Sequence, residues 1–224
     1  MRKIFAFGFI MIVAVLIAYF MTLNTKKPLP ILNPIELNSE MVDSSLQSVG
    51  LGHKIGKFSF LNQDGETITE KNVKGKVFVA EYFFTTCGTI CPKMNAQMQR
   101  VQLAYKGNSD FNILSFTVNP EVDLVPQMKM YAASHGAVKN QWHFLTGDKK
   151  DLYSLARKSF FVLKPAEAQN LGDAKSDFIH TNNFVLIDKQ MRIRGYYEGT
   201  QPHQVDQLIK DIGQLLEEDY KIQD

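Results

Sequence analysis

Blocks of apolar and polar residues alternate along this chain with lengths that suit strands and helices. The run Val77–Phe84 is apolar at nearly every position, which is typical of a strand buried in the middle of a sheet. Further strands are expected at 58–61, 67–69, 111–118, 142–145, 184–187 and 192–197, the first two joined by a turn at Asp64–Gly65. Helices are expected at 92–105, 123–135, 149–158 and 204–216. Strands alternating with helices predict an α/β domain with a mixed sheet flanked by helices.

The N-terminal residues follow a different pattern. Arg2 and Lys3 precede Ile4–Leu23, which contains no charge and is long enough as a helix to cross the ~30 Å hydrocarbon core of a bilayer. A cleaved signal peptide is the alternative, but no small-residue cleavage site follows. We therefore expect a transmembrane signal anchor over 1–25, a linker over 26–48 and one domain over 49–224. The short N-terminal flank suggests that this domain is exported, to the bacterial periplasm or, alternatively, to the mitochondrial intermembrane space.

Charge argues against a nucleic-acid partner. The chain has 25 Lys and Arg against 23 Asp and Glu, and setting aside Arg2 and Lys3 leaves 23 of each sign. No basic cluster remains that could follow a phosphate backbone.

The candidate chemistry lies in Cys87 and Cys91, which are the only cysteines of the chain. They follow the expected central strand, and Pro92 suits the first turn of the helix that comes next. Thioredoxin-like folds present reactive sulfur in this way, although disulfide oxidoreductases separate the cysteines by two residues rather than three. The wider spacing permits thiol chemistry and also makes a chelate for a soft metal ion.

The position of each sulfur suggests its role. Cys91 is expected near a helix N-terminus, where free amides and the helix dipole favour a thiolate. Cys87 is expected on the exposed loop, which would make it the sulfur that attacks a disulfide.

His180 is the candidate third ligand. It lies just before the strand at 184–187, where thioredoxin-like proteins carry a cis-proline facing the dithiol, and Thr181 is expected to take that place here. Two thiolates and an imidazole suit Cu(I) or Cu(II). Zinc is the competing metal, but a closed structural zinc site needs a fourth ligand that the sequence does not obviously supply.

Structural explanations remain open for several of these residues. The two cysteines could form an ordinary disulfide in an exported protein. Met94 and Met98 share a helical apolar stripe and are expected in the core, as is Trp142. The remaining histidines are expected on the surface or in loops and receive no role; they are His53, His135, His143 and His203.

Over about residues 50–220 the chain resembles the Sco/SenC family. The resemblance is carried in order by Phe84-Thr85-x-Cys87-x-x-x-Cys91-Pro92, Asn119-Pro120-Glu121-Val122-Asp123, Trp142-His143-Phe144-Leu145-Thr146-Gly147 and His180. It implies a thioredoxin-like copper-binding protein whose copper ligands are Cys87, Cys91 and His180. Family members help to deliver copper to the binuclear site of cytochrome c oxidase subunit II, or reduce the cysteines of that site.

The chain departs from the family pattern at three places. Asn119 stands where Asp is usual, Ile179 replaces an Asp before the histidine, and Gly88-Thr89-Ile90 replaces the usual residues between the cysteines. Loss of a carboxylate beside the histidine would retune affinity or redox potential. These differences bear on which client protein can be inferred from the family more than on whether the copper site can be inferred from it.

The sequence therefore predicts a membrane-anchored copper metallochaperone rather than an enzyme in the strict sense. Its partners would be cytochrome c oxidase subunit II or another exported cuproprotein, together with a thiol reductant. The alternative is a thiol-disulfide reductase in which Cys87 attacks a client disulfide and Cys91 resolves the mixed disulfide. A peroxidase of the peroxiredoxin type is disfavoured, because it needs Thr three residues before the reactive cysteine, where this chain has Phe84 and Gly88.

Overall fold

The computed structural model describes residues 11–15, 27–37, 42, 51–162 and 181–218, and within these a five-stranded sheet has the order β5-β4-β3-β6-β7. The central strand β3 (Val77–Phe83) runs parallel to β4 (Phe111–Thr117), which is parallel to β5 (Trp142–Leu145). On its other side β3 is antiparallel to β6 (Asn183–Ile187), which pairs with β7 (Ile193–Glu198). The expected mixed sheet is confirmed.

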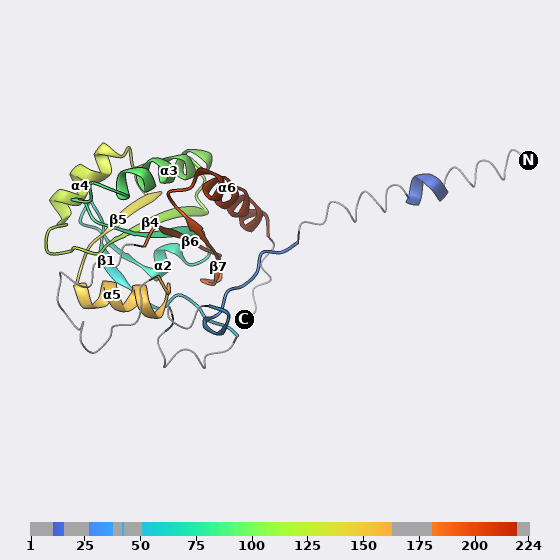
Figure 1. Ribbon diagram of the computed structural model, residues 1–224, viewed down its shortest axis with the longest axis horizontal. Coiled ribbons are helices and arrows are strands. Elements are labelled where there is room, and N and C mark those ends of the chain that lie inside the picture. Colours follow the sequence, from blue (N-terminus) through green and yellow to red (C-terminus); the bar gives the residue numbers. More distant parts are fainter. Residues whose placement is uncertain (1–10, 16–26, 38–41, 43–50, 163–180, 219–224) are drawn as a thin grey trace, which may run out of the picture.

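Helices cover both faces of this sheet (Figure 1). One face packs against α3 (Cys91–Ala104), α4 (Val125–Ser134) and α6 (Pro202–Glu217). The other face packs against α5 (Lys149–Lys158), the short α2 (Glu70–Val73) and the hairpin of β1 (Ser59–Leu61) and β2 (Thr67–Thr69). Gly65 allows the hairpin turn because its φ of 76° lies in the left-handed region.

The expected elements occur with small shifts at their ends. The shifts reach two residues: α6 begins at Pro202 rather than at residue 204, and α4 begins at Val125 rather than at residue 123. Leu124 is extended, with ψ of 164°, and the side chain of Asp123 binds neighbouring segments instead of entering the helix. Tertiary hydrogen bonds therefore set this boundary. The apolar pattern did not predict α2 or the 3₁₀ turn η1 (Pro34–Glu36).

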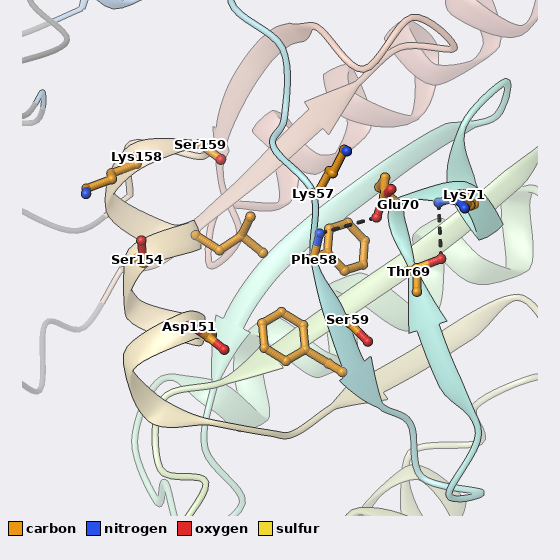
Figure 2. Close-up of a pocket in the computed structure, with 12 residues that line it drawn as sticks. Lys57, Phe58, Ser59, Thr69, Glu70, Lys71, Asp151, Ser154, Lys158 and Ser159 are labelled. Atoms are coloured by element: carbon orange, nitrogen blue, oxygen red, sulfur yellow. Dashed lines mark hydrogen bonds between the residues drawn. The ribbon is translucent and has the colours of Figure 1, made fainter.

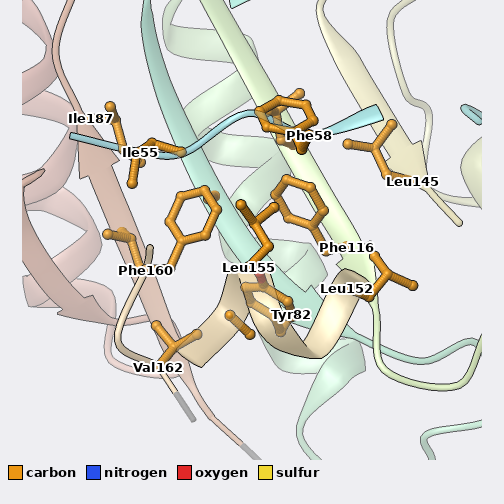
Figure 3. Packing of buried hydrophobic residues seen from close by; sticks show 14 of the residues in the cluster. Ile55, Phe58, Tyr82, Phe116, Leu145, Leu152, Leu155, Phe160, Val162 and Ile187 are labelled. Atoms are coloured by element: carbon orange, nitrogen blue, oxygen red, sulfur yellow. The ribbon is translucent and has the colours of Figure 1, made fainter. Parts of the chain in front are cut away.

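Alternate side chains of the strands enter two cores. On the α5 side, Leu152 and Leu155 pack against an aromatic group that includes Tyr82 and Phe116 (Figure 3). On the other side, Met94, Met98 and Trp142 are buried, which confirms their expected core role.

Buried charges close the end of the sheet at which β3 begins. Asp188, in the turn between β6 and β7, is fully buried and accepts hydrogen bonds from Arg192 and Arg194. Arg194 also binds Glu218 at the C-terminal end of α6 and the main-chain oxygens of Leu29 and Pro30. The described part of the expected 26–48 linker therefore contacts the domain, and Val42 is buried in the core on the α5 side.

Among the described residues, no helix has the length and apolar character needed to cross a membrane. The expected anchor over 1–25 lies outside the described residues except for 11–15.

We expect Arg194→Met to lower the free energy of unfolding by about 3–5 kcal/mol, because Asp188 would remain buried with one fewer cationic partner. Arg100→Met is the matched control, since its ion pair with Asp206 is exposed and should contribute less than about 1 kcal/mol. Urea unfolding of both variants measures the difference. Equal losses would show that the buried cluster has no special role in stability.

Candidate functional site

The two cysteines lie at the carboxyl end of the central strand. β3 ends at Phe83, the chain turns through 84–90, and Cys91 is the first residue of α3. The main-chain amide of Cys87 donates to the oxygen of Phe84 at 3.2 Å, which folds the loop back over the end of the strand. No disulfide joins the two cysteines, and their exposed fractions are 9% for Cys87 and 3% for Cys91. A dithiol is therefore held just below the surface at this edge of the sheet.

Hydrogen bonds distinguish the two sulfurs. The amide of Cys91 donates to Sγ of Cys87 at 3.4 Å, and the hydroxyl of Thr89 lies 3.7 Å from the same sulfur. Burial raises the pKa of Cys87, but the hydrogen bonds from Cys91 and Thr89 outweigh burial and lower it to about 7. Burial and the neighbouring Cys87 sulfur raise the pKa of Cys91 to about 12. Cys87 is therefore the sulfur that ionises near neutral pH.

The expectation that the helix N-terminus favours a thiolate at Cys91 is wrong. The free amide of the first helical residue points at the sulfur of Cys87, so the start of α3 stabilises charge on the loop cysteine. The side chain of Cys91 instead enters the core between α3 and the sheet. Sequence position alone could not show which sulfur faces the amide.

Asp123 connects the dithiol loop to the sheet. Its carboxylate is fully buried and accepts hydrogen bonds from the amide and hydroxyl of Thr85 and from the hydroxyl of Thr117 at the end of β4. Thr85 is two residues before Cys87, so Asp123 restrains the entry to the loop. The sequence singled out both residues only through the family resemblance, without a role.

Glu81 is a site residue that sequence reasoning missed. It lies on the face of β3 that packs against α3, where it is 1% exposed, and its Oε1 accepts a hydrogen bond from Ser115 at 2.6 Å. The other carboxylate oxygen, Oε2, is buried without a partner. Burial raises the pKa of Glu81 to about 7, and the Ser115 hydrogen bond opposes part of the rise. The charge of Glu81 in turn contributes to the raised pKa of Cys91. The signal for it was a lone acid within the apolar run Val77–Phe84.

His180 lies outside the described residues, so the structure does not test the expected third ligand. Thr181, next to it, is 8% exposed and accepts a hydrogen bond from the amide of Asn183. Within the described part of the chain, no three His, Cys, Asp or Glu side chains form a group that could hold a metal ion.

The other histidines have structural surroundings. His53 binds the main-chain oxygen of Ser159, and the ring of His135 binds that of Tyr131. His143 was expected on the surface or in a loop, but it lies in β5 and is 7% exposed.

A hollow of about 560 Å³ lies elsewhere, between the β1–β2 hairpin and α5. Figure 2 shows Asp151 and Ser154 on one side of it and Ser59 and Thr69 on the other. Neither cysteine lines this hollow, so it is separate from the dithiol.

We expect iodoacetamide to alkylate Cys87 with a midpoint near pH 7, because only its thiolate form reacts rapidly. Cys91 should remain unreactive through neutral pH. Thr89→Val should move the Cys87 midpoint to higher pH by removing a hydrogen bond to the sulfur, whereas Thr86→Val, at an exposed neighbouring threonine, should not. Mass spectrometry of alkylated peptides resolves the two sites, and identical midpoints for both cysteines would contradict the assignment.

We expect the stability of the protein to fall as the pH rises toward 7 through the ionisation of Glu81. Its folded pKa of about 7 exceeds the ordinary 4.5, so its contribution is fully present below pH 4.5 and is lost as the pH rises through 7. The shift corresponds to roughly 3 kcal/mol. Urea unfolding at about pH 5 and about pH 8 should show this loss in the native protein and in the exposed control Glu121→Gln, but not in Glu81→Gln. The same loss in Glu81→Gln would assign it to another group.

Comparison with known proteins identifies the family. The family model described as SCO1/SenC matches residues 48–217. The SCO1 protein homolog of Bacillus subtilis is 34% identical over 166 residues, which cover 72% of this chain and 82% of the relative.

Two solved structures are similar to this chain in both fold and sequence. BsSco, a member of the Sco family of cytochrome c oxidase assembly proteins for which a disulfide switch is described, has 32% identity and a TM-score of 0.61, covering 74% of this chain and 94% of its own. Arabidopsis thaliana ScoI with copper bound has 28% identity and a TM-score of 0.55, covering 71% and 98%. The match spans most of the domain that carries Cys87 and Cys91, and the chain belongs to the SCO1/SenC family.

Proposed function

We propose that this protein is a membrane-anchored copper metallochaperone that binds copper through Cys87, Cys91 and His180 and supports assembly of the binuclear copper site of cytochrome c oxidase. The observation that carries the proposal is the pair of free cysteines at the edge of the sheet, with Sγ of Cys87 accepting a hydrogen bond from the amide of Cys91. The copper-bound Arabidopsis relative and the oxidase-assembly role of the family support it.

The donor chemistry fits copper. Two sulfurs four residues apart form a soft chelate, and soft thiolate ligands select Cu(I) among common metals. Cys87 ionises near neutral pH, so the first sulfur is available as a ligand without a strong base. Cys91 would lose its proton on binding, because metal coordination deprotonates a thiol.

The pairing of β6 with β3 supports His180 as the third ligand. Val185 lies opposite Ala80 in this antiparallel pair. Continued along the same register, Thr181 would come level with Phe84, where the dithiol loop begins. His180 would then follow at the edge of the sheet that carries the sulfurs.

Delivery would proceed by exchange of ligands. The shallow position of Cys87 lets a client thiolate approach copper while Cys91 and His180 still hold it. Asp123 keeps the start of the loop in place during this exchange through its hydrogen bonds to Thr85.

A dithiol reductase is the second candidate, and the unequal pKa values of the two sulfurs favour it. The Cys87 thiolate would attack a client disulfide and displace one client thiolate, which takes a proton. Cys91 would then lose its proton and attack Cys87, releasing the second client thiol and leaving a Cys87–Cys91 disulfide. A separate dithiol reductant would have to restore the reduced pair.

We expect the reduced full-length protein in detergent to bind one Cu(I) under anaerobic titration against a chromophoric chelator. Cys87→Ser and Cys91→Ser should abolish stoichiometric binding, and His180→Ala should weaken it by at least about tenfold. His203→Ala is the matched control, since His203 is exposed at the start of α6.

Unchanged affinity in His180→Ala would remove His180 from the site. Failure of the native protein to bind copper, with continued reduction of a client disulfide, would replace the metallochaperone by the reductase.

A further inference from the structure

The N-terminal segment 27–37, which we call the strap, is fastened to the domain at several points. Two guanidinium nitrogens of Arg194 bind the strap: Nε donates to the oxygen of Pro30 at 3.0 Å and Nη2 to the oxygen of Leu29 at 2.6 Å. The third, Nη1, donates to the carboxylates of Asp188 and Glu218. The amide of Leu32 donates to the oxygen of Ile193 on β7. The oxygen of Lys27 accepts from the side chain of Gln214 on α6. The strap therefore has a defined place on the domain.

The strap lies at the end of the sheet opposite the dithiol. Cys87 lies in the loop that leaves the carboxyl end of β3, whereas the amide of Gly75, before β3, donates to the oxygen of Lys189 in the β6–β7 turn. That turn carries Asp188, which binds Arg194, and Arg194 binds the strap. In Figure 1 the strap (blue) leaves the body on the side of α6 and β7.

Exposed apolar side chains stand on and beside the strap. Ile31 is 37% exposed and Ile35 is 63% exposed. Leu51 is 87% exposed and precedes Gly52 and His53, whose amides donate to the side chain of Asn33 in the strap. These side chains face solvent although the strap backbone is firmly held.

Lysines surround the same end of the domain. Six are exposed or half-buried there, namely Lys27, Lys54, Lys74, Lys76, Lys106 and Lys189. By the same criterion, the carboxylates described at this end include the exposed Glu36, Asp110 and Glu217 and the half-buried Glu218, which is paired with Arg194. The excess is therefore positive. Exposed apolar groups among lysines are the features by which protein surfaces bind anionic lipid headgroups.

The segment between the apolar run and the strap is short. Only Asn24, Thr25 and Lys26 separate the apolar run ending at Leu23 from Lys27. Four Cα–Cα steps span at most about 14 Å even when fully extended. A domain fastened at Lys27 would thus be kept next to the bilayer that holds residues 4–23.

We propose that this end of the domain, formed by the strap, the β6–β7 turn and the lysines around them, is a docking surface for an anionic lipid bilayer. The dithiol then faces away from the membrane, toward clients that approach from the aqueous side. This inference rests on the anchoring that is part of the proposed function.

The test uses the full chain with Cys87 and Cys91 replaced by Ser, reconstituted in vesicles of phosphatidylcholine with an equal amount of phosphatidylglycerol. A fluorophore is attached to Ser109→Cys, in the exposed turn before β4, or to Glu121→Cys, at the dithiol end. We expect headgroup nitroxide lipids to quench the first label several-fold more strongly than the second. Equal quenching of both labels would overturn the proposal, because a docked face holds the first label nearer to the headgroups than the second.

Charge variants test the lysines. Lys74→Glu with Lys76→Glu should remove the difference between the labels, whereas Lys93→Glu with Lys129→Glu, on α3 and α4, should leave it unchanged. The lipid-headgroup assignment would be overturned if the two labels were still quenched unequally in the protein with Lys74→Glu and Lys76→Glu. Unequal quenching in vesicles of phosphatidylcholine alone would overturn it as well.

Two controls separate this inference from the proposed function. Extraction of the native protein by alkaline carbonate would refute anchoring and docking together but would leave the copper titration valid. Failure of the native protein to bind copper, together with unequal quenching in the labelled variants, would refute the metallochaperone and leave the docking surface in place.

Discussion

Strand β3 is bonded to β4 on one side and to β6 on the other, and all seven of its side chains are buried. Its parallel register with β4 aligns the carboxyl ends of the two strands, so the dithiol loop and the 118–124 loop emerge side by side. The bond from Thr85 to Asp123 depends on this alignment. The position of the cysteines is thus set by backbone pairing in the middle of the sheet.

The short loop after β3 produces two unlike sulfurs from the same residue type. The sulfur of Cys87 receives the free amide at the start of α3, while Cys91 is turned into the core near Glu81. A thiolate formed at neutral pH can hold a soft metal or attack a disulfide. The geometry of the dithiol is therefore compatible with copper binding and with disulfide reduction, the two activities proposed above.

The two ends of the sheet have different physical characters. At the dithiol end, the buried carboxylate of Asp123 is satisfied by hydroxyl and amide donors, and a loop approaches the surface. At the other end, Asp188 and Arg194 form a buried ion pair that also holds the strap. Removing either partner of a buried pair leaves an uncompensated charge, so the strap is tied to the stability of the domain.

Much of the fold could be predicted from the sequence because apolar periodicity and turn residues are local signals. The run Val77–Phe84, the Asp64–Gly65 turn and the helix at 149–158 were predictable for this reason, and the spacing of Cys87 and Cys91 marked the dithiol. Only the tertiary structure decided which sulfur receives the helix amide, that Glu81 is buried beneath the dithiol, and that Arg194 holds the strap. These features depend on contacts between residues distant in the sequence, or on the direction of a single N–H bond, and neither leaves a periodic pattern in the chain.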